Sequence, residues 1–226
     1  MRRSISMISI CCLTMALSAC SQSQTGALVG SSSQEKDTVK PKENIQKTSY
    51  PIVSEEPIVI SETYIYDSLY QVQLVMTKGY YSNPGLSSYP NAWHGDFSLR
   101  VLESGEVVSE KKIDFEDGMG LAFPYSFQLH MNDMNGDKSV DVAIGQYLGS
   151  GKIECKLYSI DKKGVISSLD IEGEKVLYVA GNDISPEFQV TKDGKVKYQS
   201  FATDSDESNE IIDSYLVWDN NKFTKQ

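Results

Sequence analysis

One short run carries a spacing that demands a specific chemistry, and it spans residues 133–141, Asp-Met-Asn-Gly-Asp-Lys-Ser-Val-Asp. Side-chain oxygens stand at its first, third, fifth and ninth positions, and a backbone carbonyl is available at the seventh. The residues are Asp133, Asn135, Asp137, Asp141 and, for the carbonyl, Ser139. Alternate positions of a tight loop point inward, so these oxygens can converge on one hard cation. Three carboxylates without His or Cys favour calcium over zinc or copper.

The sequence on both sides of this run alternates apolar and polar residues. The alternation covers residues 125–131 upstream and residues 140–144 downstream. A period of two predicts a strand, a loop and a second strand, whereas an EF-hand has a helix on each side. An EF-hand loop also has Gly at its sixth position and Glu at its twelfth, where this chain has Lys138 and Ile144.

Together with the following Val-Ala-Ile-Gly at 142–145, the run resembles the calcium loop of FG-GAP and VCBS repeats. These repeats occur in the propellers of integrin α-chains and in many bacterial surface proteins. The resemblance covers one copy of the loop, and it implies calcium held by the five residues named above. It departs at Lys138, where the family usually has Gly, and this lowers the expected affinity. An acidic turn solvated between two strands is the alternative.

The chain begins with a segment that is typical of a signal peptide, residues 1–19. Arg2 and Arg3 precede an apolar run, residues 5–17, which is shorter than the ~20 residues needed to span a bilayer. The run ends in Leu-Ser-Ala-Cys at 17–20, which resembles the lipobox of bacterial lipoproteins. This resemblance implies cleavage before Cys20, acyl chains on Cys20, and an anchor on the extracytoplasmic face of a bacterial membrane. Secretion without acylation and an uncleaved anchor are the alternatives.

Residues 20–56 have the composition of a tether. Ser, Gln, Lys, Thr, Glu and Pro predominate, and large apolar residues are too few to offset the entropy of ordering. We therefore expect an acylated Cys20 and a disordered linker, whose coil dimension of about 35 Å lifts the following domain clear of the lipid headgroups. With Cys20 acylated, Cys155 is the one thiol of the mature chain, so no intrachain disulfide is expected.

Residues 57–226 predict one all-β domain. Short apolar runs are divided by turn residues such as Asp193-Gly194, and no window shows a convincing helical stripe. Consecutive hairpins predict an antiparallel meander that closes as a sandwich, a barrel or a few propeller blades. We favour a sandwich or a propeller-like stack. The expected strands are 57–66, 70–78, 96–102, 107–115, 125–131, 140–147, 152–160, 165–171, 176–180, 187–191, 195–201, 211–218 and 222–225.

Residues 79–95 are expected to form a long loop rich in aromatic and amide side chains. Rings can stack on a sugar or a peptide while amides donate and accept hydrogen bonds. The loop is therefore a candidate binding face for an envelope glycan or a protein partner, through Tyr80, Tyr81, Tyr89 and Trp93. The alternative is that these rings pack against the chain's own sheet.

Residues suited to catalysis are sparse, which makes an enzyme the less favoured interpretation. His94 and His130 are the two histidines, and the chain has no Gly-x-Ser-x-Gly elbow, HExxH motif or phosphate-binding glycine loop. The net charge of −10 argues against nucleic acid as a partner. We expect a binding or interaction module at the cell envelope, with a calcium-dependent hydrolase of envelope glycans or peptides as the alternative.

Overall fold

A computed structural model describes residues 52–66, 68–82, 91–115, 120–124, 126–202 and 210–226. The expected signal peptide, Cys20, Tyr89 and most of the tether lie outside these ranges. The described residues form strands and no helix, so the predicted all-β class is confirmed. Accordingly, no membrane-spanning helix is found in this part of the chain.

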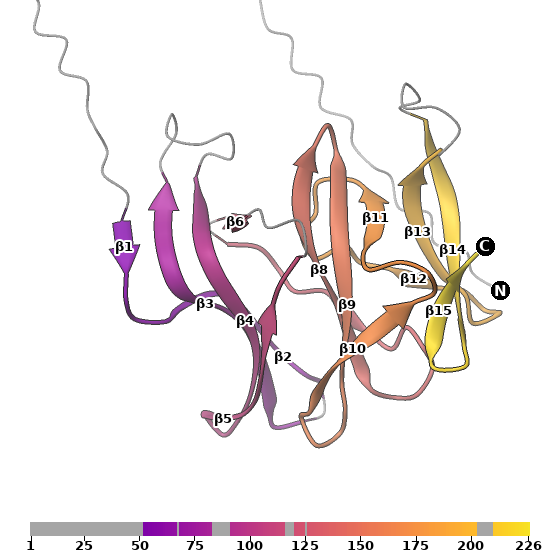
Figure 1. Cartoon of the computed structure of the whole chain (residues 1–226). Coiled ribbons are helices and arrows are strands. Elements are labelled where there is room, and N and C mark those ends of the chain that lie inside the picture. The colour runs from indigo at the N-terminus through magenta and orange to yellow at the C-terminus, as the bar shows by residue number, and fades with distance from the viewer. Residues whose placement is uncertain (1–51, 67, 83–90, 116–119, 125, 203–209) are drawn as a thin grey trace, which may run out of the picture. The chain divides into compact units, whose positions relative to one another are not determined.

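The first of two sheets has six strands, all paired antiparallel (Figure 1). Strands β1 and β2 both pair with β3, while β4 joins β3 to β5 and β6. The strands are β1 (Ile52–Ser54), β2 (Ile58–Tyr64), β3 (Tyr70–Ser82), β4 (Ala92–Glu103), β5 (Glu106–Ile113) and β6 (Leu121–Pro124). Strand β1 lies within the range expected to be tether, and β6 is a strand that the sequence did not predict.

The second sheet has nine strands in the order β12-β13-β14-β15-β10-β9-β8-β7, with β11 also paired to β9. The strands are β7 (Met131–Asn132), β8 (Val140–Gly149), β9 (Lys152–Ile160), β10 (Ile166–Ile171), β11 (Leu177–Ala180), β12 (Gln189–Val190), β13 (Val196–Phe201), β14 (Ile211–Asp219) and β15 (Lys222–Lys225). Among these described strands, β10 and β15 make the one parallel pair. The predicted antiparallel meander is thus confirmed.

The β8–β9 hairpin is the middle layer of the domain. One of its faces packs against the first sheet in a core that includes Phe97, Ile144 and Tyr158. Its other face packs against the strands of the C-terminal half, in a second core that includes Cys155 and Phe223. Because both faces are covered, most residues of β8 and β9 are buried, including the polar residues Asp141 and Glu154. The stacked layers match the predicted sandwich or propeller-like stack.

The prediction of a long loop over residues 79–95 is wrong at both ends, because β3 and β4 extend into this range and pair there; residues 83–90 lie outside the described residues. Gly79 and Gly95 are directly paired in the two strands. A Cβ on Gly79 would lie 2.1 Å from the carbonyl oxygen of His94, and one on Gly95 would lie 2.0 Å from that of Lys78. These glycines therefore permit two backbones to approach closely inside a sheet and do not mark a loop.

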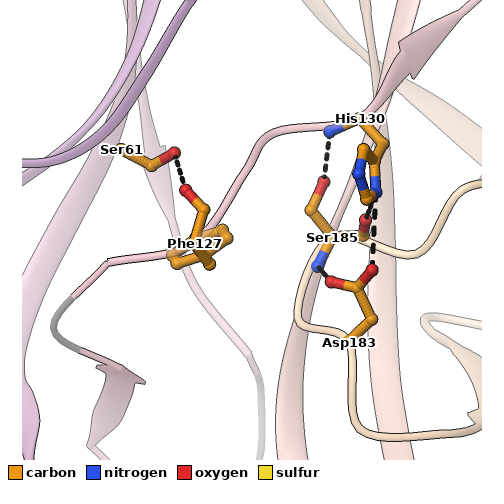
Figure 2. A network of polar contacts seen from close by, with 5 residues as sticks. All are labelled: Ser61, Phe127, His130, Asp183 and Ser185. Carbon is orange, nitrogen blue, oxygen red and sulfur yellow. Dashed lines mark hydrogen bonds and ion pairs between the residues drawn. The ribbon is translucent and has the colours of Figure 1, made fainter.

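The predicted strand over residues 125–131 is also wrong for most of its length. Of the described residues in this range, only Met131 belongs to a strand, the short β7. The preceding chain is held by single contacts, as Figure 2 shows: the Ser61 hydroxyl donates to the Phe127 carbonyl at 2.5 Å, and the His130 N–H donates to the Ser185 hydroxyl at 3.0 Å. Leu129 is buried in the first core. The alternation in the sequence thus reflects an extended segment lying on the core without a ladder partner.

Candidate cation site

The loop between β7 and β8 is built around the Asp133 carboxylate. Its two oxygens accept the backbone N–H groups of Gly136 at 2.7 Å and Lys138 at 3.0 Å. Gly136 and Lys138 have positive φ angles of 77° and 68°, so the chain turns tightly around the carboxylate. The left-handed conformation at Lys138 is strained for a residue that carries a side chain.

Asn135 and Asp137 continue the same pattern along the loop. The Asp137 N–H donates to Asn135 Oδ1 at 3.0 Å, Asn135 Nδ2 donates to Asp137 Oδ2 at 3.1 Å, and the Ser139 N–H donates to Asp137 Oδ1 at 2.7 Å. Partial burial acts to raise the pKa of the Asp137 carboxyl, but the hydrogen bonds from Ser139 and Asn135 together lower it below its usual value. Asp137 is therefore a carboxylate at neutral pH.

Asp141 lies on β8 and is fully buried, with 0% of its surface exposed. Its Oδ2 accepts the Met134 N–H at 2.8 Å, whereas its Oδ1 is buried and accepts no hydrogen bond from the described residues. Burial raises the pKa of the Asp141 carboxyl; the Ser159 side chain and the Met134 N–H oppose this rise, and the charge of Asp137 adds to it. A buried carboxylate with one unsatisfied oxygen is costly unless a positive partner is supplied.

Four of the five residues predicted as ligands lie in the loop between β7 and β8, and Asp141 lies at the start of β8; their donor atoms are all oxygen. Within the described ranges, however, no three Asp, Glu, His or Cys side chains converge closely enough to hold a metal ion by themselves. A carboxylate oxygen that accepts one N–H still has a free lone pair, so the hydrogen bonds of Asp133 and Asp137 do not exclude a cation. The oxygen-only donor set and the unsatisfied Asp141 Oδ1 both fit calcium.

The aromatic residues expected to form a binding face are divided by the fold. Trp93 is only 8% exposed and belongs to the first core, and the half-buried Tyr81 contacts it with ring centroids 4.8 Å apart. Tyr80 is 41% exposed and stacks on the His94 ring at 5.2 Å, while Tyr89 lies outside the described residues. Packing against the chain's own sheet therefore describes Trp93 and Tyr81.

Each histidine has a serine neighbour that the sequence did not predict. Ser82 Oγ lies 2.9 Å from His94 Nε2, but Ser82 is only 1% exposed and so is inaccessible as a nucleophile. Across the β3–β4 hairpin, the two residues are twelve positions apart in the chain. A contact of this kind depends on the register between β3 and β4, which could not be predicted because both residues were expected to lie in a loop.

The second contact joins His130 to Ser185 and Asp183 (Figure 2). His130 Nδ1 lies 2.7 Å from the Ser185 carbonyl oxygen and 3.4 Å from Asp183 Oδ2, and the Ser185 N–H donates to Asp183 Oδ1 at 3.0 Å. The Ser185 hydroxyl accepts the backbone N–H of His130 and does not contact its ring. The geometry is therefore not that of a nucleophile activated by a base. These contacts connect His130, which precedes the loop, to the segment 181–188.

A cleft of about 290 Å³ is lined in part by residues 186–188 of that segment. Phe188 and Tyr198 line it, together with Lys197 and Asp213, which form an ion pair at 2.7 Å. This ion pair does not mark a particular ligand. No protein-family model matches the chain, and searches of the curated proteins and of the solved structures found no match.

Proposed function

We propose that this protein is a lipid-anchored, extracytoplasmic β-domain that binds calcium in the loop 133–141 and acts as a binding or interaction module at the bacterial cell envelope. The observation that supports calcium most strongly is the buried Asp141 carboxylate, whose Oδ1 accepts no hydrogen bond from any described residue. A cation at this oxygen replaces the lost hydration and turns an unfavourable burial into a favourable contact.

Calcium suits this loop better than the other common cations. The donors are carboxylate, amide and carbonyl oxygens, and the loop itself has no His or Cys. Calcium accepts six to eight oxygens in a flexible arrangement, whereas magnesium demands near-ideal octahedral geometry and retains its water. Asp133, Asn135, Asp137 and Asp141 would supply side-chain oxygens and Ser139 its carbonyl. The ion would supply a central positive charge that holds these oxygens together.

The role at the envelope rests on the N-terminal sequence. A lipobox ending in Cys20 and a tether rich in Ser, Gln and Lys are typical of lipoproteins that hold a folded domain away from a membrane. Acyl chains bind a bilayer stably when two or more are present, since each buried CH₂ contributes ~0.8 kcal/mol. In this arrangement calcium stiffens the loop beside the middle layer of the domain, and the domain's surface meets an envelope glycan or protein.

Titration calorimetry on the purified protein tests the calcium proposal. We expect heat of binding with a Kd of roughly 10⁻⁴–10⁻³ M for calcium, and much weaker binding of magnesium. The variant Asp137→Ala removes a charged oxygen ligand from the middle of the loop and should abolish the heat. Failure of the wild-type protein to bind at millimolar calcium would reduce the loop to a solvated acidic turn.

A further inference from the structure

Asn132 is the residue immediately before the loop, on β7, and it stands directly opposite Asp141 on β8. Its Nδ2 donates to the Phe188 carbonyl oxygen at 2.6 Å. Because a carbonyl oxygen can only accept, this bond identifies which end of the Asn132 amide is nitrogen. The other end, Oδ1, is buried and accepts no hydrogen bond in the described part of the chain.

Asn132 and Asp141 belong to a row of polar side chains that crosses three strands. Asp141 is paired with Asn132 on one side and with Ser159 of β9 on the other. Directly opposed residues of an antiparallel pair have Cβ atoms about 4.5–5.5 Å apart on the same face of the sheet. The Oδ1 atoms of Asn132 and Asp141 are therefore carried by adjacent side chains, and both are acceptors without a donor.

Apolar side chains lie next to this row, and they cannot donate hydrogen bonds to the two Oδ1 atoms. The Met134 backbone donates to Asp141, and the Phe188 backbone accepts from Asn132. The side chains of Met134 and Phe188 are both buried in the second core. Each buried acceptor that is left unsatisfied costs free energy, and two such acceptors on neighbouring residues are rare in a folded core. One positive partner placed between them would satisfy both at once.

We infer that Asn132 Oδ1 is a further ligand of the cation proposed for the loop, and that the ion binds on the β7–β8 row, at the buried side of the loop. The inference rests on the proposed function and adds a residue that the calcium-loop spacing does not include. It also connects the ion to the segment 181–188, because the same Asn132 side chain holds the Phe188 carbonyl through its Nδ2.

Two substitutions at Asn132 separate a ligand from a structural role. Both Asn132→Ala and Asn132→Asp remove the Nδ2 donor to Phe188, but only Asn132→Asp retains an oxygen at the position of Oδ1. If Asn132 is a ligand, Asn132→Ala should weaken calcium affinity by about tenfold or more. Asn132→Asp, which keeps the oxygen, should bind calcium more tightly than Asn132→Ala. Gln128→Ala serves as control, since Gln128 is an exposed amide in the chain just before β7.

Calcium affinities are measured by calorimetry, and melting in chelator reports the stability of each metal-free variant. Wild-type affinity in Asn132→Ala would overturn the inference and leave the calcium proposal standing. Equal loss of affinity in Asn132→Ala and Asn132→Asp, in step with their loss of stability, would assign Asn132 a structural role and overturn the inference too. Absence of calcium binding in the wild-type protein would overturn both proposals.

Discussion

Asp141 lies in the middle layer of the domain, where its carboxylate has no access to water and its Oδ2 accepts the Met134 N–H. An unsatisfied buried acceptor costs about 1–3 kcal/mol, which is a large share of a domain's stability. The spacing of the sequence predicted Asp141 as a ligand. Its burial was not predictable, because it depends on how the β8–β9 hairpin packs between the two cores.

The first prediction concerns Asp141→Asn in the presence of chelator. The new amide can donate to Asn132 Oδ1 and still accept the Met134 N–H, so we expect a gain of up to about 1–3 kcal/mol at neutral pH. Because burial raises the pKa of Asp141, the metal-free wild-type protein loses stability as pH rises from the unfolded value of about 3.9 through the raised folded value.

The gain from Asp141→Asn should therefore be small at low pH and complete above the folded pKa. Thermal melts of both proteins in chelator over this range measure it. A variant that is less stable than wild type at neutral pH without metal would show that Asp141 is satisfied in a way that the structure does not contain.

The second prediction concerns Trp93, whose ring belongs to the first core. Trp93→Ala should cost 3–5 kcal/mol of unfolding free energy, the usual range for a buried aromatic. Tyr80→Ala, at the exposed ring on the neighbouring strand, should cost much less. Urea unfolding of the two variants provides the comparison. Similar midpoints for Trp93→Ala and wild type would mean that the ring is exposed and available to a ligand.

At the scale of elements, the strands of the middle layer were the most predictable. Both were expected from their apolar runs, 140–147 and 152–160, and both were found, as β8 (Val140–Gly149) and β9 (Lys152–Ile160). The β3–β4 hairpin was misread because Gly79 and Gly95 look the same in a sequence whether they open a loop or allow close backbone contact. Only the pairing of the two strands distinguishes these roles.

The third prediction tests that role of glycine in the hairpin. Gly79→Ala places a methyl group against the His94 carbonyl and should destabilise the domain by about 1–3 kcal/mol or more, because the backbones must separate. Gly120→Ala is the matched control, since a Cβ there meets nothing within 4 Å. Denaturant melts compare the two. Equal stability of both variants would show that β3 and β4 do not pair closely at Gly79.

At the scale of the whole molecule, the contacts around the candidate site join distant parts of the chain. His130 and Ser185 are 55 positions apart, and Asn132 and Phe188 are 56 apart. Local periodicity contains no information about such pairs, so the contact between Asn132 and Phe188 could not be predicted from the sequence. The all-β class and the antiparallel meander were predictable because they follow from strand-length runs and turn residues.

The fourth prediction concerns the anchor, which lies outside the described residues. Cys20→Ala removes the thiol that would carry an acyl chain, so the protein should leave the membrane fraction or accumulate as unprocessed precursor. Fractionation and gel mobility of the expressed protein measure this, with Cys155→Ala as control because that thiol is buried in the second core. A Cys20→Ala protein that fractionates and migrates like wild type would contradict the lipoprotein proposal.

The calcium dependence of thermal unfolding tests the central claim most directly. A ligand that binds only the folded state stabilises it by RT ln(1 + [L]/Kd), which is ~2.7 kcal/mol at free calcium about 100 times Kd. We predict that calcium raises the melting temperature of the wild-type protein, that magnesium raises it much less, that chelator reverses the rise, and that Asp137→Ala abolishes it. An unchanged melting temperature at millimolar calcium, with no heat of binding, would contradict the account.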